Sequence, residues 1–197
     1  MAVVIFDLMG IVFTESHIIQ NVLHPMLQKR FHGLSYDVVK EAYNKYSIGQ
    51  LNRLGFWLAM CVKDYDAFEK KYLDTFKLNS DFMPIAKYLK SKGHEIVIFT
   101  NLPTDWAQYL MKKYGLEKFV SETIISGETG VKKPDRAAYE IVVEKICGKE
   151  PVYFIDDKSE NLMPVSRYGW KTVTIGVDIS FKPDFSLKSM SELKNIL

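Results

Sequence analysis

The sequence predicts an α/β fold: an open, doubly wound parallel sheet with a helical segment inserted between its first and second strands. Short segments that are apolar on both faces alternate with stretches of helical hydrophobic spacing. This alternation is missing from residues 15–80, where only helical spacing occurs. We therefore expect a core domain formed by residues 1–14 and 81–197, and a helical domain formed by residues 15–80.

The expected strands are rich in β-branched and aromatic residues, as strands covered by helices on both sides should be. They are VVIFDL at 3–8, EIVIFT at 95–100, TIIS at 123–126, VYFID at 152–156 and KTVTI at 171–175. The helices between them should begin after residues favoured at helix N-termini and end at glycines. The expected starts are Asp81, Thr104 and Ser159, and the expected ends are Gly115, Gly148 and Gly169.

Four apolar stripes at helical spacing fill the inserted segment, at 18–27, 38–46, 51–61 and 65–76. Pro25 should kink or end the first of these helices, because it lacks an amide donor and its ring clashes with the preceding turn. The aromatic residues of the stripes should mostly pack in a core, with one or two of them lining a pocket. They are Tyr36, Tyr43, Tyr46, Trp57, Tyr65 and Tyr72.

The composition is that of an ordinary globular protein without a strong charge bias. The 197 residues include 26 basic and 24 acidic ones, a balance too even to predict binding to nucleic acid or to a membrane surface. The two cysteines form no metal or disulfide motif, which favours a reducing compartment. The apolar stretch from Ala2 to Phe13 is interrupted by Asp7 and is interpreted as a buried strand, not a signal peptide. We expect a cytoplasmic monomer or homodimer.

Carboxylates stand at the ends of two expected strands, at the sheet edge where open α/β folds bind ligands. Asp7 ends the first strand, where it can act as a nucleophile, ligate a hard cation or simply cap a turn. Asp156 and Asp157 end the fourth strand, and their mutual repulsion favours a bound cation over a capping pair. Together the three carboxylates predict an all-oxygen site of the kind that Mg²⁺ prefers.

Two further signals suit a phosphate group. Thr100 and Asn101 end the second strand, and their hydroxyl and backbone N–H groups can bind phosphate oxygens, although both residues also favour ordinary turns. Lys133 stands before Pro134 at a helix start and can neutralise a nucleophile and phosphoryl oxygens; a solvated lysine is the alternative. The neighbouring Lys132 is expected to face solvent.

In their order and strand context, these signals resemble the haloacid dehalogenase-like superfamily, which has a Rossmann-like core and an inserted cap. The C-terminal segment PDFSLKSMSELKNIL is similar to the last strand and helix of that family. The FIDDKSEN and KKPD segments are most similar to a branch that contains sugar-phosphate phosphatases and the N-terminal phosphatase domain of soluble epoxide hydrolases. The resemblance implies a Mg²⁺-dependent phosphatase acting on a small phosphorylated metabolite.

The resemblance also implies a nucleophile and a metal site. Asp7 would attack phosphorus and become an aspartyl phosphate. Mg²⁺ would be held by Asp7, the backbone carbonyl of Met9 and Asp157, with Asp156 either as a further ligand or as a support behind the ligands.

The substrate groups follow in the same way from the resemblance. Thr100 and the backbone of Asn101 would bind the phosphoryl oxygens, and Lys133 would balance their charge. Residues 15–80 would form a cap that closes over the substrate and excludes water.

One position departs from the family pattern. Phosphatases of this family usually carry a second aspartate two residues after the nucleophile, where it acts as a general acid and base; here that position is Met9. A thioether does neither job, and general acid–base catalysis typically contributes about 10²–10⁴-fold. Three explanations stay open: an acidic leaving group, substitution by Glu15 or His17, or a slow or inactive protein that binds a phosphate ligand.

Two other functions compete with the phosphatase. A 2-haloacid dehalogenase also uses an aspartate nucleophile and needs no acid, but the dehalogenases of this superfamily work without metal and usually have an aromatic residue at the position of Met9. A non-catalytic binding protein accounts for Met9 but leaves Asp7, Lys133 and the acidic pair unexplained. The phosphatase remains our prediction.

The remaining charged residues are interpreted as structural or solvated. Arg53 is expected in solvent, with contact to a substrate anion as the alternative. Glu69, Lys70 and Lys71 are predicted to form a solvated helix face. The histidines show no metal-ligand spacing and are interpreted as structural or surface residues; they are His17, His24, His32 and His94.

Overall fold

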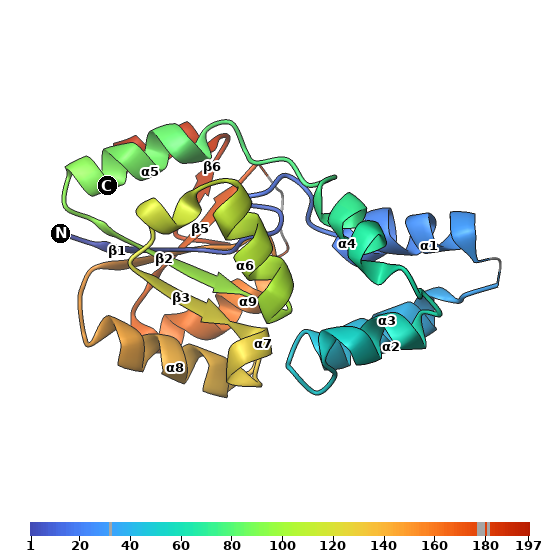
Figure 1. The fold of residues 1–197 in the computed structure, drawn as a ribbon. Coiled ribbons are helices and arrows are strands. Elements are labelled where there is room, and N and C mark those ends of the chain that lie inside the picture. Colours follow the sequence, from blue (N-terminus) through green and yellow to red (C-terminus); the bar gives the residue numbers. More distant parts are fainter. Residues whose placement is uncertain (32, 177–179, 181) are drawn as a thin grey trace.

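A computed structural model describes residues 1–31, 33–176, 180 and 182–197, so the interpretation of His32 lies outside the described residues. Its centre is a six-stranded parallel sheet with the strand order β3-β2-β1-β4-β5-β6 (Figure 1). The strands are β1 Val3–Phe6, β2 Glu95–Thr100, β3 Glu122–Ile125, β4 Val152–Ile155, β5 Lys171–Ile175 and β6 Phe185–Leu187. The predicted doubly wound parallel sheet is confirmed.

The register of the central strands brings the predicted polar residues to one edge. Phe6, the last residue of β1, pairs with Ile98 of β2 and with Ile155 of β4. All of β1 is buried, as its apolar sequence on both faces requires. Asp7 and Asp156 therefore leave the sheet side by side, each one residue beyond its strand.

Helices cover both faces of the sheet (Figure 1). One buried cluster packs the sheet against α5 (Phe82–Ser91), α6 (Thr104–Lys113) and η4 (Met190–Asn195). The other packs it against α8 (Arg136–Ile146) and η3 (Met163–Tyr168), which follows the short helix α9 (Ser159–Leu162). The described core also contains η2 (Leu116–Lys118) and α7 (Ser126–Thr129).

The helix ends show where local sequence decides the structure. Gly115 and Gly169 adopt φ values of 65° and 71° just after α6 and η3, as expected of glycines beyond a helix. At the end of α8 the left-handed conformation begins at Cys147, with φ of 51°, one residue before Gly148. These helix ends lie where the sequence predicts them.

Every element between Ile18 and Leu73 in the described part of the chain is helical, as predicted. The elements are the π-helix η1 (Ile18–Leu23), α1 (His24–Arg30), α2 (Tyr36–Tyr46), α3 (Arg53–Ala59) and α4 (Tyr65–Leu73). Pro25 lies in the first turn of α1, where a missing amide donor breaks no helical hydrogen bond. The proline therefore marks a change from π- to α-helix at Leu23–His24 instead of an end.

The inserted helices join the core through a short paired stem. Phe13 and Leu78 form an antiparallel bridge, flanked by Thr14 N–H donating to the Lys77 carbonyl over 3.1 Å. Asn79 N–H donates to the carbonyl of Val12 over 2.8 Å. The two connections of the insert thus leave the core next to each other.

A buried carboxylate on α4 links the insert to the core. Glu69 is only 5% exposed, and its Oε1 accepts from the indole N–H groups of Trp57, at 2.8 Å, and of Trp106 in α6, at 2.7 Å. Its Oε2 accepts from Arg53 at 2.6 Å, and Arg53 also pairs with Asp66. The prediction of a solvated face at Glu69 is therefore wrong, because indole and guanidinium donors from other elements satisfy the carboxylate. Arg53, whose side chain is 35% exposed, faces solvent in part, as predicted, and is ion-paired as well.

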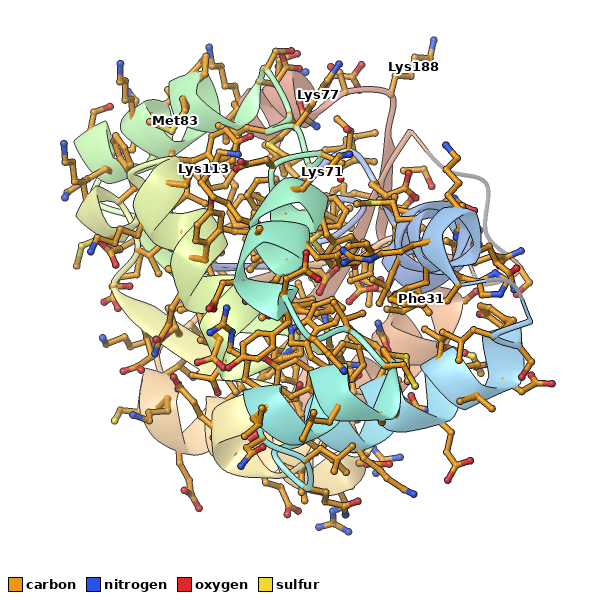
Figure 2. All side chains as sticks on the ribbon, turned by 45° about the vertical axis from the view of Figure 1, so that its right-hand side comes forward. Phe31, Lys71, Lys77, Met83, Lys113 and Lys188 are labelled. Carbon is orange, nitrogen blue, oxygen red and sulfur yellow. The ribbon has the colours of Figure 1, made fainter. Side chains whose placement is uncertain are left out.

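A second polar link joins the end of α4 to α6. Asp74 accepts from Lys113 at 2.7 Å and from Tyr109 at 2.8 Å, and from Lys70 one turn earlier on α4. In Figure 2, which brings the right-hand side of Figure 1 forward, Lys113 lies beside α4.

Among the described residues, no helix has both the length and the apolar character needed to cross a bilayer.

Candidate active site

Asp7 and Lys133 meet at the carboxyl end of the sheet although 126 residues separate them. Lys133 Nζ donates to Asp7 Oδ1 at 2.6 Å, to Asp156 Oδ2 at 2.6 Å and to the Phe99 carbonyl at 2.8 Å. The lysine is 2% exposed and its ammonium also lies 5.0 Å from the centre of the Phe99 ring. An ammonium is tolerated at such a buried position because it is paired with carboxylates and fully hydrogen-bonded.

Burial and charge act in opposite directions on this lysine. Burial lowers the pKa of Lys133, but the attraction of Asp156 and then of Asp7 outweighs it, so the pKa lies above its ordinary value. The two carboxylates at 2.6 Å therefore favour the ammonium form of Lys133. The alternative of a solvated lysine is excluded by its burial.

Several hydrogen bonds fix the position of the Asp156 carboxylate. Besides Lys133, its carboxylate accepts from the backbone N–H of Lys158 at 2.9 Å and from the side-chain amide of Asn161 at 2.9 and 3.0 Å. The carbonyl of Asn161 in turn accepts from the Tyr139 hydroxyl at 2.7 Å. Asp156 is fully buried, and its contacts position Lys133.

Asp157 differs sharply from its neighbour. Its Oδ1 is buried and has no hydrogen-bond partner among the described residues. Its Oδ2 lies over Gly10, where an added Cβ would come within 2.5 Å of that oxygen. Gly10 also has φ of 92°, so both the backbone and the close carboxylate require glycine here.

The acidic side chains fit a divalent cation. Asp7, Asp156 and Asp157 each offer a carboxylate oxygen, and these oxygens lie within 4.8 Å of one another. Lys133 alone offsets only part of their charge, and the unpartnered oxygen of Asp157 lacks a positive ligand. Hard oxygen donors of this kind suit Mg²⁺.

The pKa values of the carboxyl groups report the same crowding. Burial raises the pKa of Asp7 to about 7; Lys133 opposes this rise, while Asp156 and Asp157 add to it. Burial and then Asp156 raise the pKa of Asp157 to about 6. Both carboxyl groups thus lie in surroundings that disfavour their charged forms.

Thr100 and Asn101 lie in the same neighbourhood. Both line a cleft of about 950 Å³ that also exposes Asp7, Met9, Lys133 and Asp157 to the space between core and insert. The Asn101 side chain pairs with the Lys133 backbone, donating to its carbonyl at 2.8 Å and accepting from its N–H at 2.9 Å. Six of the seven predicted site residues thus line one cleft. Asp156, the seventh, does not line the cleft but accepts a hydrogen bond from Lys133.

The inserted helices complete the far side of the cleft. Tyr43 of α2 donates from its hydroxyl to the Asn101 carbonyl at 2.9 Å. Lys132 Nζ donates to the Asn44 side chain at 3.1 Å and lines the cleft, which corrects the prediction that Lys132 simply faces solvent. These contacts are not predictable from the sequence because they depend on how the insert docks. Asn161 was also missed, although its place in the helix that follows the acidic pair is a usable signal.

The two residues proposed as substitutes for the missing aspartate lie differently. His17 lines the cleft together with Met9. The Glu15 carboxylate accepts from His17 N–H at 3.0 Å and from Asn21 at 2.9 Å and is not part of the cleft wall. Of the two, only His17 is placed to reach a substrate.

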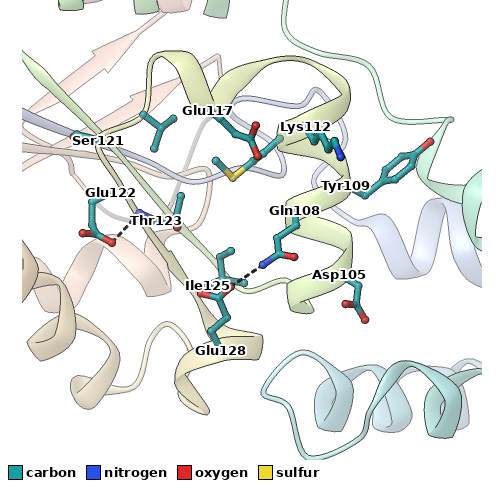
Figure 3. A pocket seen from close by; sticks show the side chains of 12 residues that line it. Asp105, Gln108, Tyr109, Lys112, Glu117, Ser121, Glu122, Thr123, Ile125 and Glu128 are labelled. Atoms are coloured by element: carbon teal, nitrogen blue, oxygen red, sulfur yellow. Dashed lines mark hydrogen bonds between the residues drawn. The ribbon is translucent and has the colours of Figure 1, made fainter.

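A second cavity of about 650 Å³ lies between α6 and the edge strand β3 (Figure 3). It contains none of the predicted site residues. Gln108 of α6 donates to Glu128 across its mouth at 3.1 Å. Its lining is mainly acidic and apolar, without the cation–carboxylate pairing found at Asp7.

A comparison of the sequence with models of protein families identifies the family of this chain. The family model described as haloacid dehalogenase-like hydrolase matches residues 1–164. The chain belongs to the haloacid dehalogenase-like hydrolases. The resemblance predicted from Asp7, Thr100, Lys133 and the acidic pair is thereby confirmed at the level of the family.

Individual relatives of this hydrolase are distant. It is 27% identical to a ribulose-1,5-bisphosphate 5-phosphatase of Halopiger xanaduensis over 55% of this chain but only 46% of that protein. It is 23% identical to the sesquiterpene phosphatase astK of Aspergillus oryzae over 84% of this chain and 85% of that protein. Among solved structures, a HAD phosphatase from Thermococcus onnurineus matches with a TM-score of 0.72 and 20% identity over 100% of this chain and 97% of that one, which shows the shared fold.

Proposed function

We propose that this hydrolase is a Mg²⁺-dependent phosphatase that cleaves small phosphorylated metabolites with Asp7 as its nucleophile. The observation that carries the proposal is the pairing of Asp7 with the buried Lys133 beside the unpartnered oxygen of Asp157, at the foot of an open cleft. The two curated relatives named above are both phosphatases, which supports the same chemistry.

The cation would be held by Asp7 and Asp157, with the Met9 carbonyl as the expected third protein ligand. Asp156 is proposed to support the site through Lys133 and not to bind the cation, because its oxygens already accept from Lys133, Lys158 and Asn161. When bound, Mg²⁺ would supply positive charge against the nucleophile and the phosphoryl oxygens.

The chain's own groups would carry out the transfer in two steps. An oxygen of Asp7 attacks phosphorus as the ester P–O bond breaks, which gives an aspartyl phosphate and a leaving alkoxide or phenoxide that takes its proton from solvent. Water then cleaves the acyl phosphate and restores Asp7. Lys133, the Thr100 hydroxyl and the Asn101 N–H would stabilise the phosphoryl oxygens, while the helices of residues 15–80 exclude bulk water as a cap.

The missing acid determines which substrates turn over fast. Met9 cannot protonate a leaving alkoxide, so esters with acidic leaving groups should react best. His17 is the one candidate substitute in the cleft wall.

The test is hydrolysis of p-nitrophenyl phosphate, whose leaving group needs no proton. We expect turnover that requires Mg²⁺ and that Asp7→Asn abolishes, whereas Lys45→Gln, which removes a lysine paired with Glu41 on the outer face of α2, leaves it unchanged. Turnover that survives in Asp7→Asn would show that Asp7 is not the nucleophile. Release of halide from a 2-haloacid in the presence of EDTA would instead support the dehalogenase.

A further inference from the structure

We propose that α2 and Lys132 form a subsite for a second anionic group, so that the preferred substrates are phosphate esters that also carry a carboxylate or a second phosphate. The inference deepens the proposed phosphatase function and rests on it for the reacting end of the substrate. The subsite lies on the cap side of the cleft.

One face of α2 lines the cleft. Its residues Tyr36, Lys40, Tyr43 and Asn44, with Ser47 just beyond its end, recur at spacings of three and four, which places them on one side of the helix. The Tyr43 hydroxyl donates to the carbonyl of Asn101, the residue after Thr100 at the end of β2. This face of α2 therefore lines the same cleft as Asp7.

Two lysines line the cleft at this face of α2, Lys40 from the helix itself and Lys132 from the core. Lys132 reaches across from the core to the side chain of Asn44, which is one helical turn from Lys40. Lys40 Nζ lies 5.7 Å from the centre of the Tyr36 ring, on the same stripe. Both lysines thus line the cleft beside neighbouring residues of α2.

Neither lysine has a carboxylate partner within 4.0 Å among the described residues. Lys45, on the outer face of the same helix, does pair with Glu41, at 2.8 Å. The contrast matters because an uncharged acceptor, Asn44, orients Lys132 without neutralising it. Two such cations are free to bind an anion.

The charge distribution of the cleft points the same way. In the inner site the carboxylates face Lys133 and the proposed divalent cation, and along α9 Lys158 and Glu160 offset each other. Among the cleft residues that the structure describes, Lys40 and Lys132 remain as an excess of positive charge. A molecule whose phosphate reaches Asp7 and whose other end is anionic would satisfy both ends.

The test compares substrates that differ only at the far end. Hydroxyethyl phosphate is paired with phosphoglycolate, and a hexose monophosphate with the hexose bisphosphate. We expect the wild type to show the higher kcat/KM for the doubly anionic member, mainly through KM. In the Lys40→Gln/Lys132→Gln variant this preference should fall about tenfold to a hundredfold, the range for loss of charge-assisted hydrogen bonds.

Lys45→Gln is the matched control and should keep the wild-type preference. Lys40→Arg, which keeps the positive charge, should retain most of the preference that the single variant Lys40→Gln loses. Thermal melts will show that the variants are folded. An unchanged preference in the double variant, or a wild type that favours the singly anionic member, would overturn the subsite.

A binding measurement separates this inference from the phosphatase itself. Calorimetric titration of the Asp7→Asn protein with phosphoglycolate should give weaker binding when Lys40 and Lys132 are also replaced. If this difference appears while the wild type hydrolyses nothing, the subsite stands and the phosphatase fails. If the wild type hydrolyses both members equally and binding does not change, the phosphatase stands and the subsite fails.

Discussion

Met9 occupies the position at which an acid would serve the leaving group, and it lines the cleft with 6% of its surface exposed. We expect Met9→Asp to raise kcat on alkyl phosphates, by up to about 10²–10⁴-fold if the new carboxylate is well placed. On p-nitrophenyl phosphate the gain should be much smaller, because that leaving group needs no proton. Steady-state kinetics on both esters measure the difference, and equal rates for wild type and variant on alkyl phosphates would refute the missing-acid argument.

The residues of the site were predictable where the backbone alone gathers them. Asp7 and Asp157 follow two adjacent parallel strands, Thr100 ends a third, and the carboxyl ends of such strands meet at one edge. The different surroundings of Asp156 and Asp157 were not predictable, because they depend on the directions in which adjacent side chains leave the turn. Asn161 holds one carboxylate and nothing in the described chain holds Oδ1 of the other.

At the scale of elements, helix spacing predicted each helix of the insert but not what the helices touch. Glu69 lies on a helix with lysines beside it, and its partner Trp106 is 37 residues away on α6. A carboxylate on an amphipathic helix is usually solvated, so only the docked arrangement reveals this burial.

The Glu69 contacts predict a clear difference between two substitutions. Glu69→Gln keeps a carbonyl oxygen that can accept from both indole N–H groups, whereas Glu69→Leu leaves them without an acceptor. Each unsatisfied buried donor costs about 1–3 kcal/mol, so Glu69→Leu should lower the free energy of unfolding by about 2–6 kcal/mol and Glu69→Gln by less. Urea unfolding measures both, and equal losses for the two variants would mean that the hydrogen bonds contribute little.

Asp74 predicts a pH dependence of the link between α4 and α6. Hydrogen bonds from Lys113, Lys70 and Tyr109 hold the pKa of Asp74 well below its ordinary value. Its stabilising effect is therefore complete above the unfolded-state pKa of about 4 and is lost as the pH falls toward the lower folded-state value. Asp74→Asn should lower the thermal midpoint at pH 7 relative to the wild type, with a difference that shrinks steadily below about pH 4.

The exposed Glu117 serves as a control for that series, since Glu117→Gln removes a carboxylate that has no ion-pair partner among the described residues. Its melting temperature should follow the wild type at neutral pH. An Asp74→Asn difference that is constant across the acidic range would contradict the role of the ionised carboxylate.

At the scale of the whole molecule, the proposed cation site joins segments from both halves of the sheet, so that cation binding should stabilise the entire chain. At a hundredfold excess over its dissociation constant, a ligand specific for the folded state adds about 2.7 kcal/mol. For a chain of this size this corresponds to a rise of roughly 5–10 °C in Tm on adding Mg²⁺. Calorimetric melts in Mg²⁺ and in EDTA provide the measurement.

Asp157→Asn is the informative variant in the same melts. It replaces a partly buried carboxylate, whose Oδ1 has no hydrogen-bond partner among the described residues, by a neutral amide, so it should raise Tm in EDTA while removing the response to Mg²⁺. A full rise of Tm on adding Mg²⁺ to this variant would show that the cation binds at a site that does not include Asp157.

The paired stem between Val12–Thr14 and Lys77–Asn79 has a consequence for how such a protein diversifies. Because the inserted helices leave and rejoin the core at neighbouring backbone positions, the gap between the two attachment points is small enough for different helical segments to be spliced in without disturbing β1 or Asp7. The α2 side of the proposed anion subsite and the strand-end residues of the reaction are thus encoded in separate stretches of the gene, so that the contribution of α2 can change while Lys132, Lys133 and Asp7 stay with the core.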